Sequence, residues 1–359
     1  MAPVSKIISN TVPLCFMPNG SLVCYQHGDL IVLNDGFELK RFHIIRTMKE
    51  HYLGYLKLLT RCLRLGVRSA VPINDSIVVF SIGNMLHEFN IETGVLSRGF
   101  FCGAGVRPLI FTNVENVAGF EKGLYFGAYI SDFRKIPVDV YRRLNEDKWE
   151  VVYSFPEGTI NHIHNIVADP YRNCLWIFTG DFGDAAAIWK VTENFKKVER
   201  IASNDQKYRA CVAFVLPEGL LYATDAPFAD DYIYLLNPES MELKELFPID
   251  GSCIYGCKWK EKFVFSSTVE GDGRNTPKME FLFGRKRGAG IKDDCVHMYM
   301  GDPGEGFTEI YKEKKDCMPY YTFQFGVFKY PVGVNNSDTL YFQPVATRKH
   351  DLDLMTLSL

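Results

Sequence analysis

Residues 161–202 read NHIHNIVADPYRNCLWIFTGDFGDAAAIWKVTENFKKVERIA, and this stretch shows the pattern on which the whole chain is built. It holds four short runs of apolar, aromatic and β-branched residues, separated by turn-forming clusters such as DPYRN and GDFGD. Runs of this kind predict antiparallel strands joined by tight turns. The stretch therefore predicts one four-stranded antiparallel unit.

The same unit recurs along the chain. Its most recognisable part is a turn-forming cluster followed at once by a short apolar strand. The phrases are PNG-SLVCYQHGD, IND-SIVVFSIGN, EKG-LYFGAYISD, PYRN-CLWIFTGDFGD, PEG-LLYATDAP, KEK-FVFSSTVEGDG and NNSD-TLYFQPVAT. Most steps are roughly forty to fifty residues, which is the period of propeller blades.

We therefore predict an all-β fold, a β-propeller of seven four-stranded blades. Six blades is the alternative, because the first and last units are the weakest. The last unit lacks a strand, which the segment KIISN near the N-terminus could supply, closing the ring and removing a sheet edge.

One segment breaks the pattern. In MKEHYLGYLKLLTRCLRLG, residues 48–66, the leucines follow helical spacing with Lys and Arg between them. We predict a single propeller domain over residues 1–359 with an amphipathic helical insertion at 46–66. The favoured interpretation is a helix packed on the propeller, and the alternative is peripheral membrane contact through 48–66.

Composition narrows the class of protein. Lys+Arg 40 against Asp+Glu 43 gives a net charge of -3, which argues against a nucleic-acid binder. The first residues lack the apolar region of a secretory signal. Most of the ten cysteines lie in apolar runs, as buried reduced thiols do, for example Cys24, Cys174, Cys211 and Cys253. Together these features predict a cytoplasmic protein.

In a propeller, the first strand of each blade begins at the same end of the ring as the loop between the second and third strands. Polar residues at those two positions should converge on one mouth of the central channel, as a binding or active site requires. We expect two sets of residues there. The catalytic candidates are His162, His164, Asp181, Asp225 and Tyr255, and the substrate-binding candidates are Arg68, Arg107, Arg209, Asp184 and Arg274.

The motif 161–181 is the sharpest of these. His162 and His164 lie two apart on a strand, so both should point to one face, and Asp181 ends the neighbouring strand. An imidazole pair beside a carboxylate can act as a general acid and base. A divalent metal bound by His162 and His164 is the alternative, although spacing fixes no third ligand.

The arginines suggest an anionic ligand. Arg68, Arg107 and Arg209 occupy corresponding places in three units, and a guanidinium suits bidentate binding of a carboxylate or phosphate. The equal alternative is that each arginine pairs with an Asp of a neighbouring blade. Carboxylates such as Asp184 and Asp225 carry the same ambiguity, since a pair across the mouth could also run glycoside hydrolysis. Arg274 lies in the polar, glycine-rich stretch 270–294, a predicted loop.

The stretch HIHNIVADPYRNCLWIFTGDFGDAAAIW resembles bacterial propeller proteins described as sialidase-like or glycosyl-hydrolase-like, over roughly residues 105–235. The Asp-boxes of true sialidases, S-x-D-x-G-x-x-W, are absent from the sequence. The resemblance implies a role in polysaccharide metabolism.

The sequence thus predicts a carbohydrate-active propeller that binds, and in the catalytic case cleaves, an anionic oligosaccharide or polysaccharide by His/Asp acid–base chemistry. If it is an enzyme, a glycoside hydrolase or polysaccharide lyase is expected. The alternatives are a non-catalytic sugar-binding or scaffold propeller and a membrane-associated glycosyltransferase, both in surface-polysaccharide biosynthesis.

Overall fold

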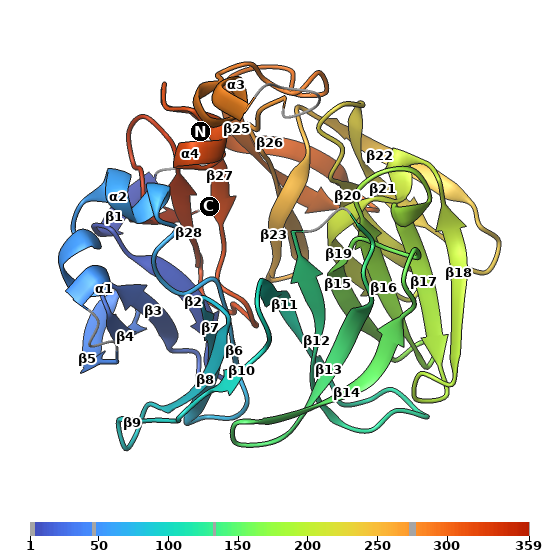
Figure 1. Cartoon of the computed structure of the whole chain (residues 1–359). Coiled ribbons are helices and arrows are strands. Elements are labelled where there is room, and N and C mark those ends of the chain that lie inside the picture. The colour runs from blue at the N-terminus through green and yellow to red at the C-terminus, as the bar shows by residue number, and fades with distance from the viewer. Residues whose placement is uncertain (1–3, 45–47, 132–133, 273–277, 359) are drawn as a thin grey trace.

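The computed structural model describes residues 4–44, 48–131, 134–272 and 278–358. Seven antiparallel sheets follow one another around a ring (Figure 1), which confirms the seven-bladed prediction. The first strands of consecutive blades lie against one another and surround the axis. They are β2 (Val12–Phe16), β6 (Ser69–Pro72), β11 (Val106–Val114), β15 (His162–Asp169), β19 (Ala210–Leu216), β23 (Cys253–Trp259) and β27 (Val327–Lys329).

The other strands of each blade step outward from the axis. The second strands are β3 (Leu22–Gln26), β7 (Ile77–Ile82), β12 (Gly123–Ile130), β16 (Cys174–Gly180), β20 (Gly219–Thr224), β24 (Lys262–Ser267) and β28 (Thr339–Val345). The third strands are β4 (Asp29–Asn34), β8 (Met85–Asn90), β13 (Val138–Asn145), β17 (Ala187–Thr192), β21 (Asp231–Leu236), β25 (Cys295–Asp302) and β29 (Leu354–Ser358).

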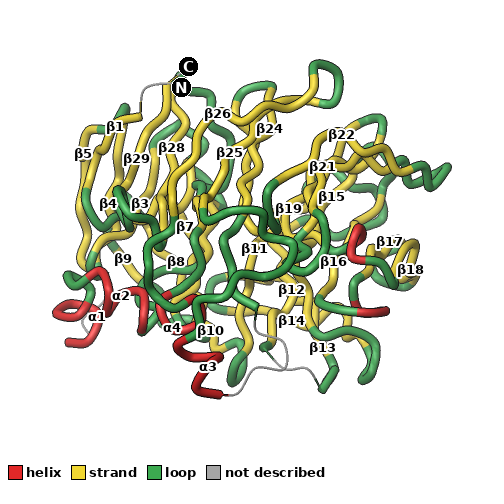
Figure 2. The backbone as a smooth tube through the Cα atoms, turned by 90° about the horizontal axis from the view of Figure 1, so that it is seen from above, coloured by secondary structure: helices red, strands yellow, loops and turns green. Residues whose placement is uncertain are grey.

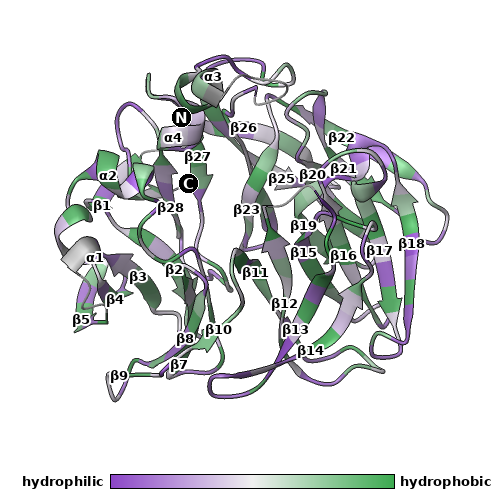
Figure 3. Cartoon of the chain, in the orientation of Figure 1, coloured by the Kyte–Doolittle hydropathy of each residue, from purple (hydrophilic) through white to green (hydrophobic). Residues whose placement is uncertain are grey.

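The outermost strands are the most exposed. They are β5 (Phe37–His43), β10 (Phe100–Phe101), β14 (Lys148–Phe155), β18 (Lys197–Ser203), β22 (Leu243–Ile249), β26 (Gly306–Lys314) and β1 (Val4–Ile8), with β9 (Val95–Leu96) also paired to β8. Figure 3 shows hydrophilic residues on outer strands such as β18 and β22, whereas every residue of β16 is buried. Amphipathic outer strands and buried inner ones account for the repeating apolar phrases of the sequence.

The N-terminal strand closes the ring. β1 pairs antiparallel with β29, so the seventh blade combines the two ends of the chain. The predicted role of the KIISN segment is therefore confirmed. This arrangement removes the unpaired edge that β29 would otherwise present.

The hydrophobic core is divided into layers between neighbouring blades. The layer between the third and fourth blades, for example, contains Tyr125, Phe155 and Ile177, and that between the fourth and fifth contains Trp176 and Tyr222. Because each blade is covered on both faces by its neighbours, the ring is stabilised only when all blades are present.

The helices gather at one end of the ring, along one edge of the side view in Figure 2. They are α1 (Met48–Leu53), α2 (Lys57–Cys62), α3 (Lys278–Phe283) and α4 (Tyr320–Phe323), with short 3-10 turns η1 (Gly183–Ala185) and η2 (Gln206–Tyr208). They occupy the loops that precede first strands or follow second strands, so they all lie at the predicted mouth. The stretch 270–294 is thus only partly a loop, because α3 lies within it.

The insertion at 46–66 is helical as predicted, but it is made of two short helices, α1 and α2, rather than one. Residues 45–47 lie outside the described part of the chain. The basic residue Arg61 does not face solvent either: it is 1% exposed and bound to other loops of the ring. Tyr52, Leu56 and Leu58 remain exposed on the insertion, and membrane contact there stays a prediction.

Candidate functional site

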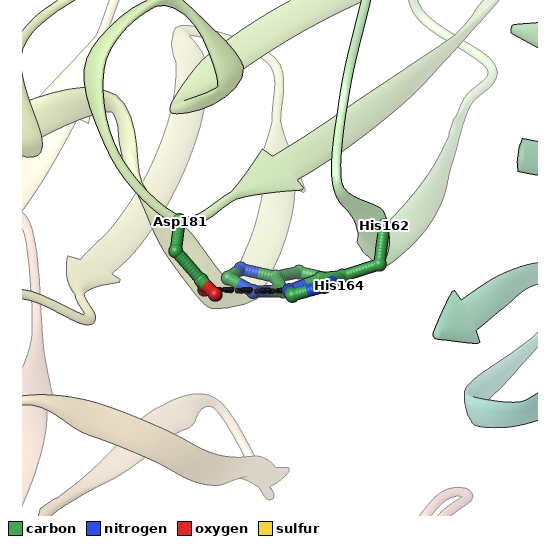
Figure 4. A group of neighbouring side chains, drawn as sticks. All are labelled: His162, His164 and Asp181. Atoms are coloured by element: carbon green, nitrogen blue, oxygen red, sulfur yellow. Dashed lines mark hydrogen bonds and ion pairs between the residues drawn. The ribbon is translucent and has the colours of Figure 1, made fainter. Parts of the chain in front are cut away.

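The site begins with two histidines at the start of β15. His162 and His164 are 2% and 3% exposed, and their Nε2 atoms lie 3.0 Å apart (Figure 4). A register shift between Ile163 and Asn165 leaves His164 as the extra residue of a β-bulge. Simple alternation along the strand was therefore the wrong reason to expect convergence. Bulges commonly re-aim side chains beside functional sites, and this one is present where the imidazoles meet.

Asp181 completes this group from the end of β16. Its Oδ1 lies 3.3 Å from His162 Nε2 and 3.4 Å from His164 Nε2. Burial alone would raise the pKa of Asp181, but the contacts with both imidazoles and the charge of Arg209 outweigh it and hold that pKa well below its usual value. Burial lowers the pKa of His162 despite the neighbouring Asp181. The group thus combines an ionised carboxylate with a neutral His162.

Arg209 joins the fourth and fifth blades. Its Nη2 lies 3.2 Å from Asp181 Oδ1 and 3.1 Å from Asp225 Oδ2, and the side chain is almost fully buried. Its guanidinium is therefore engaged by two carboxylates, as the blade-pairing alternative expects, and it is not presented to a ligand. Asp225 is likewise occupied by Arg209 and by the Cys211 thiol, which donates to it across 3.4 Å.

A group of cations lies beside the histidines. Arg68 precedes β6 and Arg107 lies in β11, as predicted, and two further cations join them: Arg64, which follows α2, and Lys329, at the end of β27. Partial desolvation, then the charge of Arg107, lowers the pKa of Arg64 and of Arg68. Desolvation, followed by repulsion from Arg68 and Arg64, lowers the pKa of Lys329 to about 8.

These four residues, here named the cation cluster, differ from Arg209 in their partners. Among the described residues, no carboxylate lies within ion-pair distance of any of the four. Arg64 and Arg68 remain exposed to water although protein surrounds them. Like charges held together without counter-charges destabilise the fold, and such an arrangement is typical of a binding site for an anion.

Two tyrosines connect the cation cluster to the histidines. Arg107 stacks on the ring of Tyr129 at 4.7 Å from its centroid, and the same ring lies 4.3 Å from that of His162. Tyr255, in β23, is electrostatically coupled to Arg107, Arg68 and Arg64. Burial raises the pKa of each tyrosine to about 12, so both are neutral phenols.

Sequence reasoning did not select Arg64, Lys329 or Tyr129. Arg64 belongs to the inserted helical segment, Lys329 belongs to one of the two weakest units, and Tyr129 lies near the end of a second strand, before the loop in which polar residues were expected. Glu270 is a further buried member: it accepts a hydrogen bond from Ser252, and burial and the charge of Asp225 raise its pKa to about 8. Glu270 follows β24, so it lies in a loop between a second and a third strand, where polar residues of the mouth were expected.

One predicted residue is not part of this group. Asp184, in η1, is exposed and pairs with Lys135 at 2.7 Å and with Arg200 at 4.0 Å. A substrate-binding role for Asp184 at the mouth is therefore not supported by its position. Arg274 lies outside the described residues.

The fold and site define a β-propeller with a polar axial mouth, and comparison with known proteins supports the fold alone. No family model matches the chain, and no curated protein matches it. The resemblance to sialidase-like proteins therefore finds support only at the level of the propeller fold.

Solved structures match over nearly the whole chain at low identity. One is a chain of the Mitotic Checkpoint Complex (TM-score 0.55, 11% identity, 99% of this chain and 94% of that one). Another is the Cps50 (Swd1) β-propeller domain of Myceliophthora thermophila (TM-score 0.58, 10% identity, 99% and 100%). A third is the extracellular domain of a one-component system from B. thetaiotaomicron (TM-score 0.56, 12% identity, 99% and 39%). Among the described residues, no helix is long and apolar enough to cross a membrane.

Proposed function

We propose that this propeller binds an anionic ligand at its axial mouth, and that the ligand is an acidic carbohydrate carrying carboxylate groups. The observation that carries the proposal is the cation cluster of Arg64, Arg68, Arg107 and Lys329, which lacks carboxylate partners among the described residues. An anion between them would offset their mutual repulsion. A planar guanidinium also binds a carboxylate through two parallel hydrogen bonds.

The tyrosines support a sugar over a simple inorganic anion. Tyr129 and Tyr255 border the cation cluster, and each offers an apolar ring beside a polar hydroxyl. Aromatic rings of this kind suit the alternating apolar and hydroxyl-bearing faces of a pyranose.

Cleavage of the ligand is the second candidate, and one contact favours it. The Tyr129 ring lies against His162, so a sugar bound by Arg107 would extend toward His162, His164 and Asp181. The neutral His162 imidazole could then accept a proton from the bound sugar. Without turnover, the same contacts define a sugar-binding module.

The test is calorimetric titration of the full chain with an oligogalacturonate, a neutral malto-oligosaccharide of the same length, and inorganic phosphate. We expect binding of the acidic sugar only, weakened at least about tenfold, or about 1.4 kcal/mol, by Arg107→Gln or Arg68→Gln. Arg200→Gln is the matched control, because Arg200 lies on the outer strand β18. Equal binding of the neutral sugar, or affinity indifferent to both variants, contradicts the proposal.

A further inference from the structure

Three ligand-type atoms meet at one point beside the axis. His162 Nε2, His164 Nε2 and Asp181 Oδ1 form a triangle with sides of 3.0, 3.3 and 3.4 Å (Figure 4). Among the described residues, no fourth His, Cys, Asp or Glu lies close to all three atoms, although His164 also lies close to Cys211 and Asp225. All three atoms can carry lone pairs that are directed toward one another.

The backbone decides the state of both imidazoles. His162 Nδ1 lies 3.1 Å from the carbonyl oxygen of Ile130, and His164 Nδ1 lies 3.3 Å from that of Ala210. A carbonyl oxygen can only accept a hydrogen bond, so each Nδ1 must carry the proton. In the neutral ring each Nε2 then presents a lone pair, and both lone pairs face Asp181 Oδ1. Backbone carbonyls orient metal-binding histidines in the same way.

The dimensions of the triangle match a metal-binding site. Zinc–nitrogen and zinc–oxygen bonds of about 2.0–2.1 Å at tetrahedral angles place neighbouring ligand atoms about 3.3 Å apart. The two sides that end on Asp181 have this length, and the His–His side is only slightly shorter. A single proton could bridge one side of the triangle but would leave the third acceptor facing another lone pair, whereas a cation satisfies all three atoms.

The charges in direct contact with the triangle favour a divalent cation. Arg209 contributes one positive charge against the two carboxylates Asp181 and Asp225, so these three residues together keep a net negative charge. Gly180 also makes room for the ligand ring: a Cβ at this position would lie 2.3 Å from His164 Cε1. Three protein ligands and a free fourth position are the usual arrangement of a zinc site that binds water or substrate.

We propose that His162, His164 and Asp181 bind a divalent transition-metal ion of the zinc class, with a fourth position for water or a ligand oxygen. The metal site does not depend on the proposed sugar, because none of its three ligands belongs to the cation cluster. If both are present, Tyr129 places the metal next to the bound anion.

A separate group of potential ligands, in the sixth blade and the loop before it, serves as a contrast. Asp250, His297 and Glu309 also lie close together, but there His297 Nδ1 lies 2.5 Å from Glu309 Oε2 and Nε2 lies 3.0 Å from Asp293 Oδ1. Both ring nitrogens already contact carboxylates, and this group contains a single histidine rather than a pair. His297→Gln is therefore the matched control variant for a histidine that should not bind metal.

The experiment uses the full chain, stripped with chelator and dialysed against Zn²⁺, with metal content measured by mass spectrometry and Co²⁺ absorption as a report of coordination geometry. We expect one Zn²⁺ per chain and a tetrahedral Co²⁺ spectrum. His164→Gln and Asp181→Asn should each weaken Zn²⁺ binding by at least about 100-fold. His297→Gln should leave it unchanged.

Substoichiometric metal in the wild type, or equal binding by the Asp181→Asn variant, would overturn the proposal, as would loss of binding in His297→Gln. Circular dichroism of the metal-free variants separates lost ligands from lost fold, and Asp181→Asn provides the test if His164→Gln does not fold. Metal binding without sugar binding would refute only the proposed function, and the reverse result would refute only the metal site.

Discussion

At the scale of single residues, the site depends on the absence of a side chain at Gly180. Gly180 pairs with His162 across the β15–β16 ladder, and its absent Cβ leaves the space that the His164 ring occupies. A close approach of this kind is one of the few reasons for glycine at the end of a buried strand. The identity of residue 180 thus controls the orientation of residue 164.

We expect Gly180→Ala to displace the His164 ring and to lower the free energy of unfolding by about 1–3 kcal/mol, the usual cost of overpacking. In a His164→Ala background the same change should cost less, because the ring that it strikes is gone. Urea denaturation of the two single variants and the double variant measures this difference. Gly304→Ala is the control, since its Cβ would approach only the flexible Asp302 side chain. Additive costs would contradict the argument.

Lys329 illustrates how the cation cluster affects stability. Desolvation, Arg68 and Arg64 lower its pKa from 10.5 to about 8 in the folded chain. Between about pH 8 and 10.5 the unfolded chain therefore binds more protons at this residue than the folded chain. By linkage, this residue's contribution makes stability rise as pH rises through that window.

Replacement of Lys329 by Met should therefore stabilise the protein at pH 7, by about 1–3 kcal/mol, and this gain should shrink toward pH 10.5. Comparison of the variant with the wild type in urea at several pH values cancels the titration of all other groups. Lys329→Arg keeps the charge and should show no such gain. A gain for Met that is independent of pH would indicate packing rather than charge.

The polar site could be predicted only where topology alone positions a residue. His162, Asp181, Arg107 and Arg68 begin first strands or end second strands, so the repeat places them at one mouth. Which of them are already paired depends on side-chain geometry, and that is why Arg209 could not be separated from the rest. Arg64 and Lys329 reach the mouth from an insertion and a weak unit, whose placement the repeat does not determine.

At the scale of elements, the insertion is fastened by one buried cation. Arg61 of α2 donates to Asp316 Oδ2 at 2.6 Å and to Asp351 Oδ2 at 3.0 Å, and its Nε donates to the Phe323 carbonyl at 2.8 Å. These partners belong to loops of the last two blades. The amphipathic pattern predicted the helical segment correctly but not this contact, because a basic residue between leucines is usually solvated.

Arg61→Met should destabilise the protein by about 3–5 kcal/mol, because it leaves Asp351 without its counter-charge and Asp316 with Lys315 alone. Lys57→Ala, on the same helix, removes a more exposed pair with Asp353 and should cost less than about 1 kcal/mol. Thermal and urea unfolding of both variants provides the comparison. Equal costs would mean that Arg61 contributes only helix packing.

The closing strand β1 protects the edge of the seventh blade, so its loss should affect the association state of the whole protein. Its pairing with β29 was expected because the last unit of the sequence repeat lacked a strand. The number of repeated units likewise predicted the number of blades. Deletion of residues 1–8 should expose the β29 edge and produce concentration-dependent association, measurable by light scattering. Lys6→Ala removes only the ion pair of the exposed Lys6 with the buried Asp353 and should leave the protein monodisperse. A monodisperse deletion variant would contradict this role of β1.

At the scale of the whole molecule, the cation cluster draws on separate parts of the ring. Arg68 comes from the second blade, Arg107 from the third and Lys329 from the seventh, while Arg64 lies at the end of the insertion. Because blades are covered only by their neighbours, an anion that contacts all of these residues couples blades that are otherwise joined in series. The proposed ligand should therefore stabilise the entire ring rather than one loop.

We expect an oligogalacturonate at about 100 times its Kd to raise the free energy of unfolding by about 2.7 kcal/mol in one cooperative transition. Circular dichroism reports all blades, and the fluorescence of Trp149, Trp176, Trp189 and Trp259 reports the third, fourth and sixth. Both signals should shift by the same amount. The shift should fall as salt is added, since the contacts are electrostatic. A shift in fluorescence alone, or one that salt does not reduce, would place the ligand outside the cation cluster.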